Sequence, residues 1–268
     1  MMSNKILLFA CAALYLASSC VAPLPKGLNA HPQGLLPSQD TSTTPNGFLE
    51  VEAINSWGET EPVASVAMRY GLAEKTELYL LQELYRAIET PGLPKTSGVG
   101  DAWLGIRHRI IESDATGTAH AFAAEVRLPH GDPELGLGTG QLELHLIHIR
   151  DTSWRRYDIT TNTGLKLRGD GEDRPDPALT ASLTLTDPLV SIGGQQLPFG
   201  VIAEVGGSWQ PEENLYPAWA ALGIRVPIHP SLELQIARIE GLGKHGPEPA
   251  WVVDLGRLVG DALDLRSR

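Results

Sequence analysis

The 268-residue sequence contains 32 Asp and Glu against 21 Lys and Arg, which gives a formal net charge of −11. This acidic balance argues against a nucleic-acid-binding protein, since such proteins present basic surfaces to phosphates. Both cysteines lie within the first twenty residues, so the remainder of the chain can form no internal disulfide.

Residues 1–20, MMSNKILLFACAALYLASSC, predict a signal peptide and therefore export. Lys5 supplies the positive start, and the apolar residues 6–17 have the length of a signal-peptide core, which is too short to span a bilayer. The stretch LASSC resembles a bacterial lipobox, in which cleavage before Cys20 leaves that cysteine as a lipid attachment point. Ordinary signal cleavage after Ser19 or Ala22 is the alternative, and the sequence leaves both open.

The rest of the chain divides into three predicted parts. Residues 21–46 are rich in Pro, Ser, Thr, Gly and Asn without periodicity, and predict a linker that lies on the periplasmic side or acts as a partial plug. Residues 47–258 are expected to form one all-β domain, followed by a C-terminal tail, 259–268. No later segment has about 18 consecutive apolar residues, so no transmembrane helix is predicted. A chain of this kind can enter a bilayer only as a closed β-barrel.

Short alternating segments separated by turn residues predict about twelve strands. Most of them are near the roughly ten residues that a tilted membrane strand needs. The predicted strands span residues 47–55, 62–72, 75–86, 99–111, 119–128, 140–150, 154–168, 179–187, 196–208, 217–227, 231–240 and 248–257.

Apolar and polar side chains alternate along these segments. YDITTNTGLKL, residues 157–167, has one apolar and one polar face, because an extended strand turns successive side chains to opposite sides. Residues 179–186 alternate Leu or Ala with Thr or Ser, and residues 141–146 alternate Leu with Gln, Glu and His. A soluble sandwich would show the same alternation, so the pattern alone leaves open whether the apolar face meets lipid or a protein core.

The connections favour a membrane barrel. Short turns at 73–74, 151–153 and 229–230 tend to alternate with longer polar loops at 87–98, 129–139, 169–178 and 209–216. Outer-membrane barrels place short turns on the periplasmic side and long loops outside. We therefore expect the four loops at one end and the three turns at the other. In this alternating order the segment 188–195 is expected on the periplasmic side, but it is longer than the short turns expected there.

Four stretches resemble an outer-membrane barrel family named after the MetA pathway of phenol degradation. They are RYGLAEKTEL (69–78), GVGDAWLGIRHRI (98–110), AEVRLPHGDPELGLGTGQLEL (124–144) and NTGLKL (162–167). The resemblance covers about residues 50–168, with a thinner match to the end, and its most specific pieces are the Gly-Asp and LP-x-GD…GLGTG segments. It implies an outer-membrane barrel linked to uptake of small hydrophobic compounds.

Neither an enzyme nor a metal site is predicted. His145 and His148 stand three apart on a strand and point to opposite faces, so they cannot chelate one metal. The glycines of GLGTG (136–140) lack a strand-to-helix context and are expected to let a loop turn. The acidic stretch 169–177 lacks EF-hand spacing and is expected to be a solvated loop. TTNTG (160–164) lacks the His and Ser of an outer-membrane phospholipase, and the rest of the sequence shows no nucleophile–base pair.

Charged side chains share the polar parity of their strands and are the candidate lumen-lining residues of a barrel. On a soluble sandwich they would face solvent, and in a narrow barrel their ion pairs could plug the lumen. These candidates are Glu50, Glu52, Arg69, Arg107, Arg109, Glu125, Arg127, Glu143, Asp158, Lys166, Glu204, Arg225 and Glu233.

The sequence therefore predicts an all-β fold, an antiparallel up-and-down transmembrane β-barrel of about 12 strands in the bacterial outer membrane. Its expected function is passive passage of a small solute by a monomer, with membrane lipid and the solute as partners and no cofactor. The alternative is a soluble-type barrel tethered through Cys20 that binds an apolar ligand inside. Outward-pointing Leu142, Leu144, Leu183 and Leu185 would favour lipid, and inward-pointing ones a ligand cup.

One further prediction concerns the register of a hairpin. Arg127 and Glu143 stand symmetrically about the middle of the loop 129–139, on the polar parity of their strands. We expect them to be opposite neighbours on the inner face.

Overall fold

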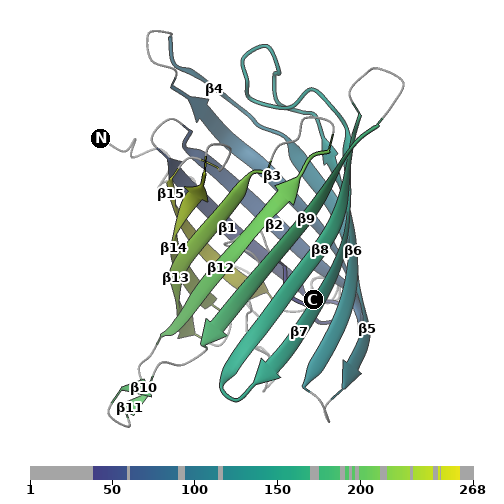
Figure 1. Ribbon diagram of the computed structural model, residues 1–268, viewed down its shortest axis with the longest axis vertical. Coiled ribbons are helices and arrows are strands. Elements are labelled where there is room, and N and C mark those ends of the chain that lie inside the picture. The colour runs from purple at the N-terminus through teal and green to yellow at the C-terminus, as the bar shows by residue number, and fades with distance from the viewer. Residues whose placement is uncertain are drawn as a thin grey trace, which may run out of the picture.

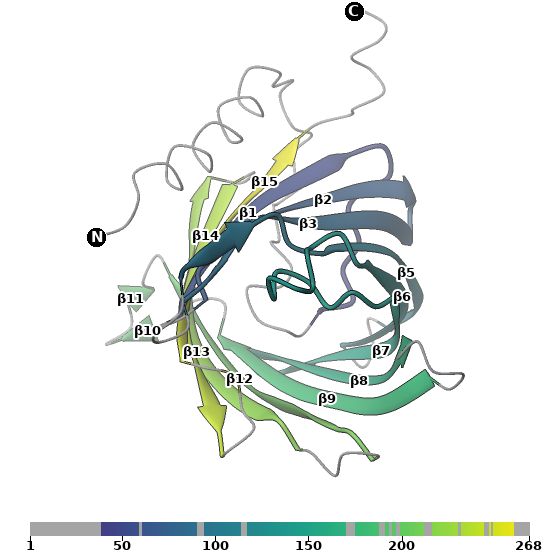
Figure 2. The same ribbon diagram turned by 90° about the horizontal axis from the view of Figure 1, so that it is seen from above.

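The computed structural model describes residues 39–58, 61–89, 94–113, 117–169, 175–187, 191–192, 195–196, 199–211, 216–229, 232–243, 247 and 249–259. Twelve antiparallel strands of 10 to 13 residues form a closed barrel (Figures 1 and 2). They are β1 (Leu49–Gly58), β2 (Val63–Ala73), β3 (Thr76–Ile88), β5 (Ala102–Ser113), β6 (Thr118–Leu128), β7 (Glu143–Trp154), β8 (Tyr157–Gly169), β9 (Pro175–Asp187), β12 (Gly200–Trp209), β13 (Ala218–His229), β14 (Leu232–Leu242) and β15 (Ala250–Val259).

Each predicted strand overlaps one of these twelve, and the all-β, up-and-down barrel is confirmed. Neighbours in sequence pair throughout, and β15 pairs with β1 to close the sheet. Three short strands were not predicted. β4 (Thr96–Gly98) pairs with the last three residues of β3. β10 (Ser191–Ile192) pairs with β11 (Gln195–Gln196) in the connection between β9 and β12. Closure leaves the barrel without an exposed sheet edge.

The connections alternate between two ends of the barrel, as predicted. The connections β3–β5, β6–β7, β8–β9 and β12–β13 lie at one end, which we call the loop end, and those of β2–β3, β7–β8 and β13–β14 lie at the other, the turn end. Several boundaries were wrong: residues 151–153 belong to β7 and the turn is 155–156, Ala73 belongs to β2, and residues 175–178 belong to β9. Arg155 adopts a positive φ of 59° in that turn. By the rule for outer-membrane barrels, we expect the turn end to be periplasmic.

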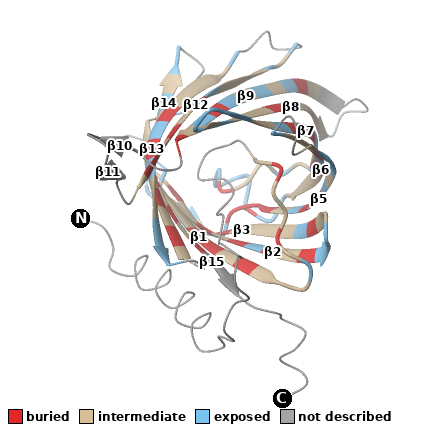
Figure 3. Ribbon diagram, turned by 90° about the horizontal axis from the view of Figure 1, so that it is seen from below, coloured by how far each residue is buried: buried red, intermediate tan, exposed pale blue. Residues whose placement is uncertain are grey.

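The two faces of the wall differ in polarity, and the apolar face points outward. Leu183 and Leu185 are 46% and 41% exposed, whereas Thr184 between them is 8% exposed and hydrogen-bonds to Glu204 of β12. Leu144 likewise alternates with the buried Glu143. Buried positions recur along the strands in alternation with exposed ones (Figure 3). Leu142 is 56% exposed but precedes β7.

The outer surface carries many exposed large apolar side chains on the strands. Exposed apolar area of this extent is a liability in water but is expected where a barrel meets lipid. Examples are Met68, Leu72, Leu78, Leu104, Ile106, Ile110, Phe122, Leu146, Leu179, Val205, Leu222 and Ile224. The largest fully buried side chains include charged ones, so the interior is polar. A barrel that binds an apolar ligand would have apolar side chains inside, whereas this one has them outside. The structure therefore does not support the alternative of a soluble-type barrel that binds an apolar ligand.

Among the residues that the structure describes, no helix is long and apolar enough to cross a membrane. The predicted signal peptide and lipid attachment at Cys20, and the C-terminal tail beyond Val259, lie outside the described residues.

Candidate functional site: the barrel lumen

Residues 39–48, the lumen segment, run inside the barrel before β1. Thr41 donates to one Asp151 carboxylate oxygen on β7 through its backbone N–H and its hydroxyl, at 2.7 and 2.6 Å. The backbone N–H of Thr44 donates to Glu77 on β3 at 2.6 Å, and that of Gln39 to Asn162 on β8 at 3.0 Å. A single segment can reach all three strands only from within the lumen.

Near the turn end, the lumen segment packs closely against β2. The backbone N–H of Gly47 donates to the Gly71 carbonyl at 2.8 Å, and the Gly71 N–H donates to the Phe48 carbonyl at 3.0 Å. A Cβ atom at Gly71 would lie 2.0 Å from the Pro45 carbonyl oxygen. Glycine is therefore required at this position for the segment to enter the lumen along this path.

A buried ion pair ties the lumen segment to the wall. Arg107 on β5 pairs with Glu77, and both side chains are almost fully buried. The Arg107 guanidinium also donates to the Asp40 carbonyl at 2.9 Å. Because Glu77 accepts from both the segment and Arg107, removal of either partner would leave a buried charge without its full set of contacts.

A second network crosses the middle of the lumen. The Tyr79 hydroxyl donates to Glu125 at 2.9 Å, and His145 Nδ1 lies 2.8 Å from the other Glu125 carboxylate oxygen. His145 Nε2 lies 3.0 Å from the Thr180 hydroxyl. Together with Gln39, whose side chain donates to Glu125 at 3.3 Å, this network connects β3, β6, β7 and β9 to the lumen segment. It places polar side chains that hydrogen-bond to one another in the lumen.

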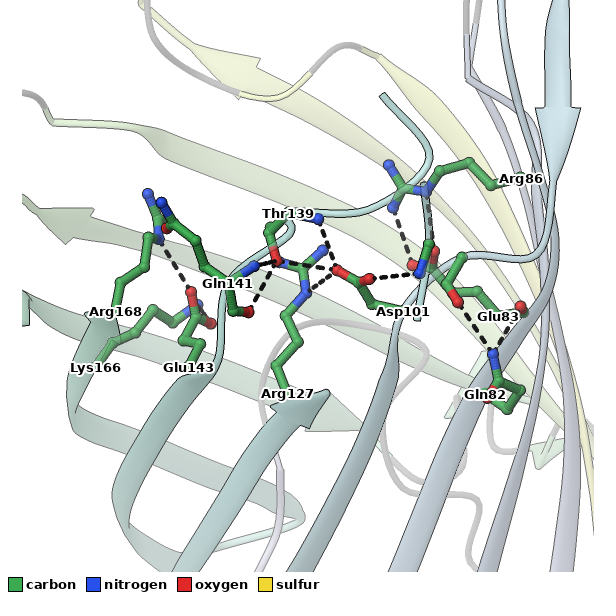
Figure 4. Close-up of polar contacts among 12 residues, drawn as sticks. Gln82, Glu83, Arg86, Asp101, Arg127, Thr139, Gln141, Glu143, Lys166 and Arg168 are labelled. Carbon is green, nitrogen blue, oxygen red and sulfur yellow. Dashed lines mark hydrogen bonds and ion pairs between the residues drawn. The ribbon is translucent and has the colours of Figure 1, made fainter. Parts of the chain in front are cut away.

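At the loop end, residues 129–142 form a loop that folds over the lumen, and we call it the mouth loop (Figure 2). Its anchor is Asp101, which is fully buried and precedes β5. Asp101 accepts hydrogen bonds from the backbone N–H groups of Gly131 and Thr139, at 3.0 and 2.9 Å, and from Arg127 at 2.8 Å (Figure 4). Leu137 in the same loop is 3% exposed.

The Asp101 carboxylate is held in its charged form. Burial raises its pKa, but hydrogen bonds from the backbone of Thr139 and Gly131 and the charge of Arg127 outweigh burial and lower the pKa below its ordinary value. The predicted turning role of the GLGTG glycines is confirmed, since Gly136 and Gly140 have φ of 72° and 67°. A Cβ atom at Gly138 would lie 2.3 Å from the Asp101 carboxylate.

The predicted register of Arg127 and Glu143 is confirmed, since the two are paired across β6 and β7. They do not form an ion pair with each other. Arg127 turns to Asp101, and Glu143 pairs with Lys166 and Arg168 of β8 at 3.0 and 3.3 Å (Figure 4). Each therefore finds an opposite charge on a different neighbour.

The inner face of β12–β15, β1 and β2 is acidic, and we call it the acidic wall. Among its described side chains are five carboxylates and two guanidinium groups. The carboxylates are Glu50, Glu52, Glu204, Glu233 and Asp254, and the guanidinium groups are Arg69 and Arg225. Arg69 pairs with Glu52, and Arg225 pairs with Glu233 at 2.9 Å. Glu204 accepts from Trp219 at 2.8 Å and from Thr184 at 3.1 Å.

All thirteen sequence-predicted lumen residues lie on the inner parity of their strands, and their role in passage stays a prediction. The structure joins some of them in pairs and networks, and it leaves Asp158 exposed near the turn end, where it accepts from Ser153 at 2.9 Å. Arg109 pairs with Glu112 on the same strand at 3.3 Å.

Sequence reasoning missed several lumen residues. Glu77 and Asp254 share the inner parity of their strands and could have been found by continuing the alternation. Asp101 and Asp151 gain their roles through contacts with the mouth loop and the lumen segment, for which the sequence gives no local signal.

The two candidate histidines lie on opposite faces, as predicted. His145 joins the lumen network, whereas His148 stacks outside against His120 at 5.3 Å. Within the described part of the chain, no group of three or more His, Cys, Asp or Glu side chains is arranged to hold a metal ion. Most of the acidic stretch 169–177 lies outside the described residues.

No protein-family model matches the chain, and no curated protein matches it. Several solved structures have a fold similar to that of this chain. The COG4313 outer membrane channel from Pseudomonas putida F1 is 13% identical with a TM-score of 0.62, over 88% of this chain and 100% of that one. The NanC porin is 8% identical (TM-score 0.54), over 79% of this chain and 98% of its own. The KdgM porin in complex with oligogalacturonate is 4% identical (TM-score 0.51), over 78% and 98%.

These three structures confirm the fold as that of outer-membrane β-barrel channels and porins. The predicted outer-membrane location agrees with theirs. The finer resemblance to the family of the MetA pathway has no match among the comparisons.

Proposed function

We propose that the protein is a passive channel for a small solute across the outer membrane. The observation that carries this proposal is the distribution of polarity, with exposed leucines such as Leu183 outside and charged side chains such as Glu52 and Arg107 inside. A barrel with an apolar exterior and a polar interior offers a hydrophilic path through lipid.

The solute is small because the lumen is narrowed at two levels. The lumen segment occupies the turn-end half, where it contacts Glu77 and Asp151. The mouth loop covers the loop end, where Asp101 anchors it. Both elements are connected by hydrogen bonds to the wall, so only molecules that fit beside them can pass.

Three solved structures that share the fold with TM-scores above 0.5 are a channel and two porins, which supports passage rather than catalysis. The described lumen is lined by ion pairs and by the Tyr79–Glu125–His145 network. This lining favours a polar solute, whereas the resemblance to the MetA-pathway family implies a hydrophobic one. A polar solute is therefore our proposal.

A liposome-swelling assay tests the proposal. The purified full chain is reconstituted into liposomes, and swelling is followed with uncharged sugars and amino acids of increasing size. We expect swelling with the smallest solutes and a sharp fall with size. Liposomes that contain correctly folded protein, shown by heat-modifiable mobility on a gel, yet swell no faster than empty ones would refute it.

A further inference from the structure

The apolar outer face of the barrel is interrupted by a charged side chain on β7. Its outward positions toward the loop end carry Leu144 and Leu146, and the next two toward the turn end carry His148 and Arg150. Arg150 is exposed, and within the described part of the chain no carboxylate forms an ion pair with it. A charge on the lipid face destabilises a barrel unless it lies near the interface or has a partner. The position of Arg150 therefore calls for an anion from outside the chain.

Polar side chains continue from Arg150 across the neighbouring strands. Arg150 stands opposite His120 on β6 and Thr161 on β8, and His148 stands opposite Thr163 on β8. All five side chains are exposed or partly exposed. We call these five residues the histidine patch. None of them is acidic, so the patch is cationic.

The two histidines of the patch leave a hydrogen-bond donor for an outside acceptor. His120 Nδ1 lies 3.1 Å from His148 Nε2, so one ring donates to the other. Two neutral imidazoles carry two N–H groups, and this contact uses one of them. The second N–H is on His148 Nδ1 when His120 donates, and on His120 Nε2 when His148 donates. In either arrangement the patch offers one N–H beside the Arg150 charge.

Aromatic side chains at the turn end indicate how deep the patch lies in the membrane. Trp154 and Tyr157 stack with ring centroids 6.3 Å apart, and such aromatic pairs sit at the membrane–water interface of barrels. Arg150 is four residues from Trp154, which corresponds to about 13 Å along the strand and about 10 Å along the membrane normal at the usual tilt. A long arginine side chain extends back toward the headgroups. The patch is therefore within reach of lipid phosphates.

We propose that the histidine patch binds the phosphate of an anionic phospholipid in the leaflet at the turn end. The guanidinium group matches a phosphate because its N–H groups can bind two oxygens at once. The acyl chains then lie over Leu146 and Leu165, which pair in register on the loop-end side of the patch. This goes beyond the proposed passage of a solute, since Arg150 faces away from the lumen.

Charge favours a lipid over a second copy of the chain as the occupant. A two-fold dimer through this face would bring two identical cationic patches together. Like charges repel each other, and in a low-dielectric surrounding they repel more strongly than in water. An anionic headgroup supplies the opposite charge and is present in the bilayer itself.

Native mass spectrometry of the full-length protein tests the proposal. The protein is held in a neutral detergent with phosphatidylglycerol and phosphatidylcholine of the same acyl chains at equal concentration. We expect phosphatidylglycerol to bind in preference, and Arg150→Gln to lower its binding by about tenfold, the effect of losing one charged hydrogen bond. The variant should fold, because Arg150 is exposed, and heat-modifiable mobility checks this.

Arg238→Gln is the matched control. It removes an outer-face arginine from β14 and changes the net charge by the same amount as Arg150→Gln. Arg238 already pairs with Glu240 at 2.7 Å, so its replacement should leave the binding of phosphatidylglycerol unchanged. Inorganic phosphate should not displace the lipid, because the acyl chains also contribute to its binding.

Four results would overturn the proposal. Equal binding of the two lipids would refute selection of an anionic headgroup. The same loss in Arg238→Gln as in Arg150→Gln would show that only net charge matters. Displacement of the lipid by inorganic phosphate would identify a site for a free anion. A dimer in the mass spectrum that Arg150→Gln dissociates would assign the patch to a second copy of the chain.

Discussion

The substitution Asp101→Asn should release the mouth loop. Asp101 is fully buried, and its carboxylate accepts from Gly131, Thr139 and Arg127. An asparagine in the same place presents one oxygen and an NH₂ group, which meets backbone N–H donors instead of accepting from them. The variant therefore loses charge-assisted hydrogen bonds without a change of size.

The expected magnitude follows from these contacts. Each hydrogen bond to a charged group contributes about 1.5–3 kcal/mol, and loss of one member of a buried ion pair costs about 3–5 kcal/mol. A cost of about 3 kcal/mol shifts the balance between the closed and the open loop by roughly a hundredfold. The loss is local, because β5 and β6 keep their backbone pairing.

Two measurements check this result. Amide hydrogen exchange at Gly131 and Thr139 should speed up by roughly the same hundredfold, and single-channel recordings should show higher mean conductance. Glu134→Gln, an exposed carboxylate on the same loop, is the control and should behave as the unmodified protein. Unchanged exchange and conductance in a folded Asp101→Asn barrel would refute the anchoring role of Asp101.

Three further predictions follow. Folding lowers the pKa of Asp101, so its contribution to loop closure is present above its unfolded-state pKa of about 3.9 and is lost as pH falls through the lower folded value. Conductance should therefore stay constant from pH 7 to 5 and rise only in stronger acid. A rise near pH 6 would contradict this. Glu143→Leu leaves Lys166 and Arg168 without their carboxylate, and it should lower the free energy of unfolding by about 2–3 kcal/mol after allowance for the partial exposure of the cations. Its unfolding temperature in detergent should therefore fall more than that of Leu183→Ala, and its conductance should change; equal effects of the two substitutions would contradict this. If Cys20 is a lipid attachment point, intact-mass measurement should show the added mass of fatty acids, and Cys20→Ser should abolish it. A mature N-terminus at Val21 or later without added lipid would refute lipid attachment.

The sequence predicted the strands and their order well because alternation is a local property. Residues 179–186 show period two from neighbour to neighbour, and the exposure of Leu183 and Leu185 against Thr184 repeats that pattern. The register of Arg127 and Glu143 followed from symmetry about one loop. Boundaries were less secure, as the misplaced turn near residue 153 shows, because polar residues of a strand end resemble those of a turn.

The lumen contents could not be predicted in the same way. Thr41 and Asp151 are 110 residues apart in the chain, and Gly131 and Asp101 are 30 apart, so their contacts exist only after the barrel has closed. Arg127 had two carboxylates within reach of its strand position, Asp101 and Glu143, and parity cannot choose between them. Alternation assigned the faces, while the partners on each face depended on tertiary structure.

The central claim is that the face carrying Leu183 meets lipid and the face carrying Ser182 meets the lumen. Spin labels at Leu183→Cys and Ser182→Cys, in a chain reconstituted into bilayers with Cys11 and Cys20 both replaced, test it directly. The label at 183 should collide mainly with oxygen, which concentrates in lipid, and the label at 182 mainly with a water-soluble nickel chelate. Water accessibility at 183 together with oxygen accessibility at 182 would contradict the transmembrane barrel.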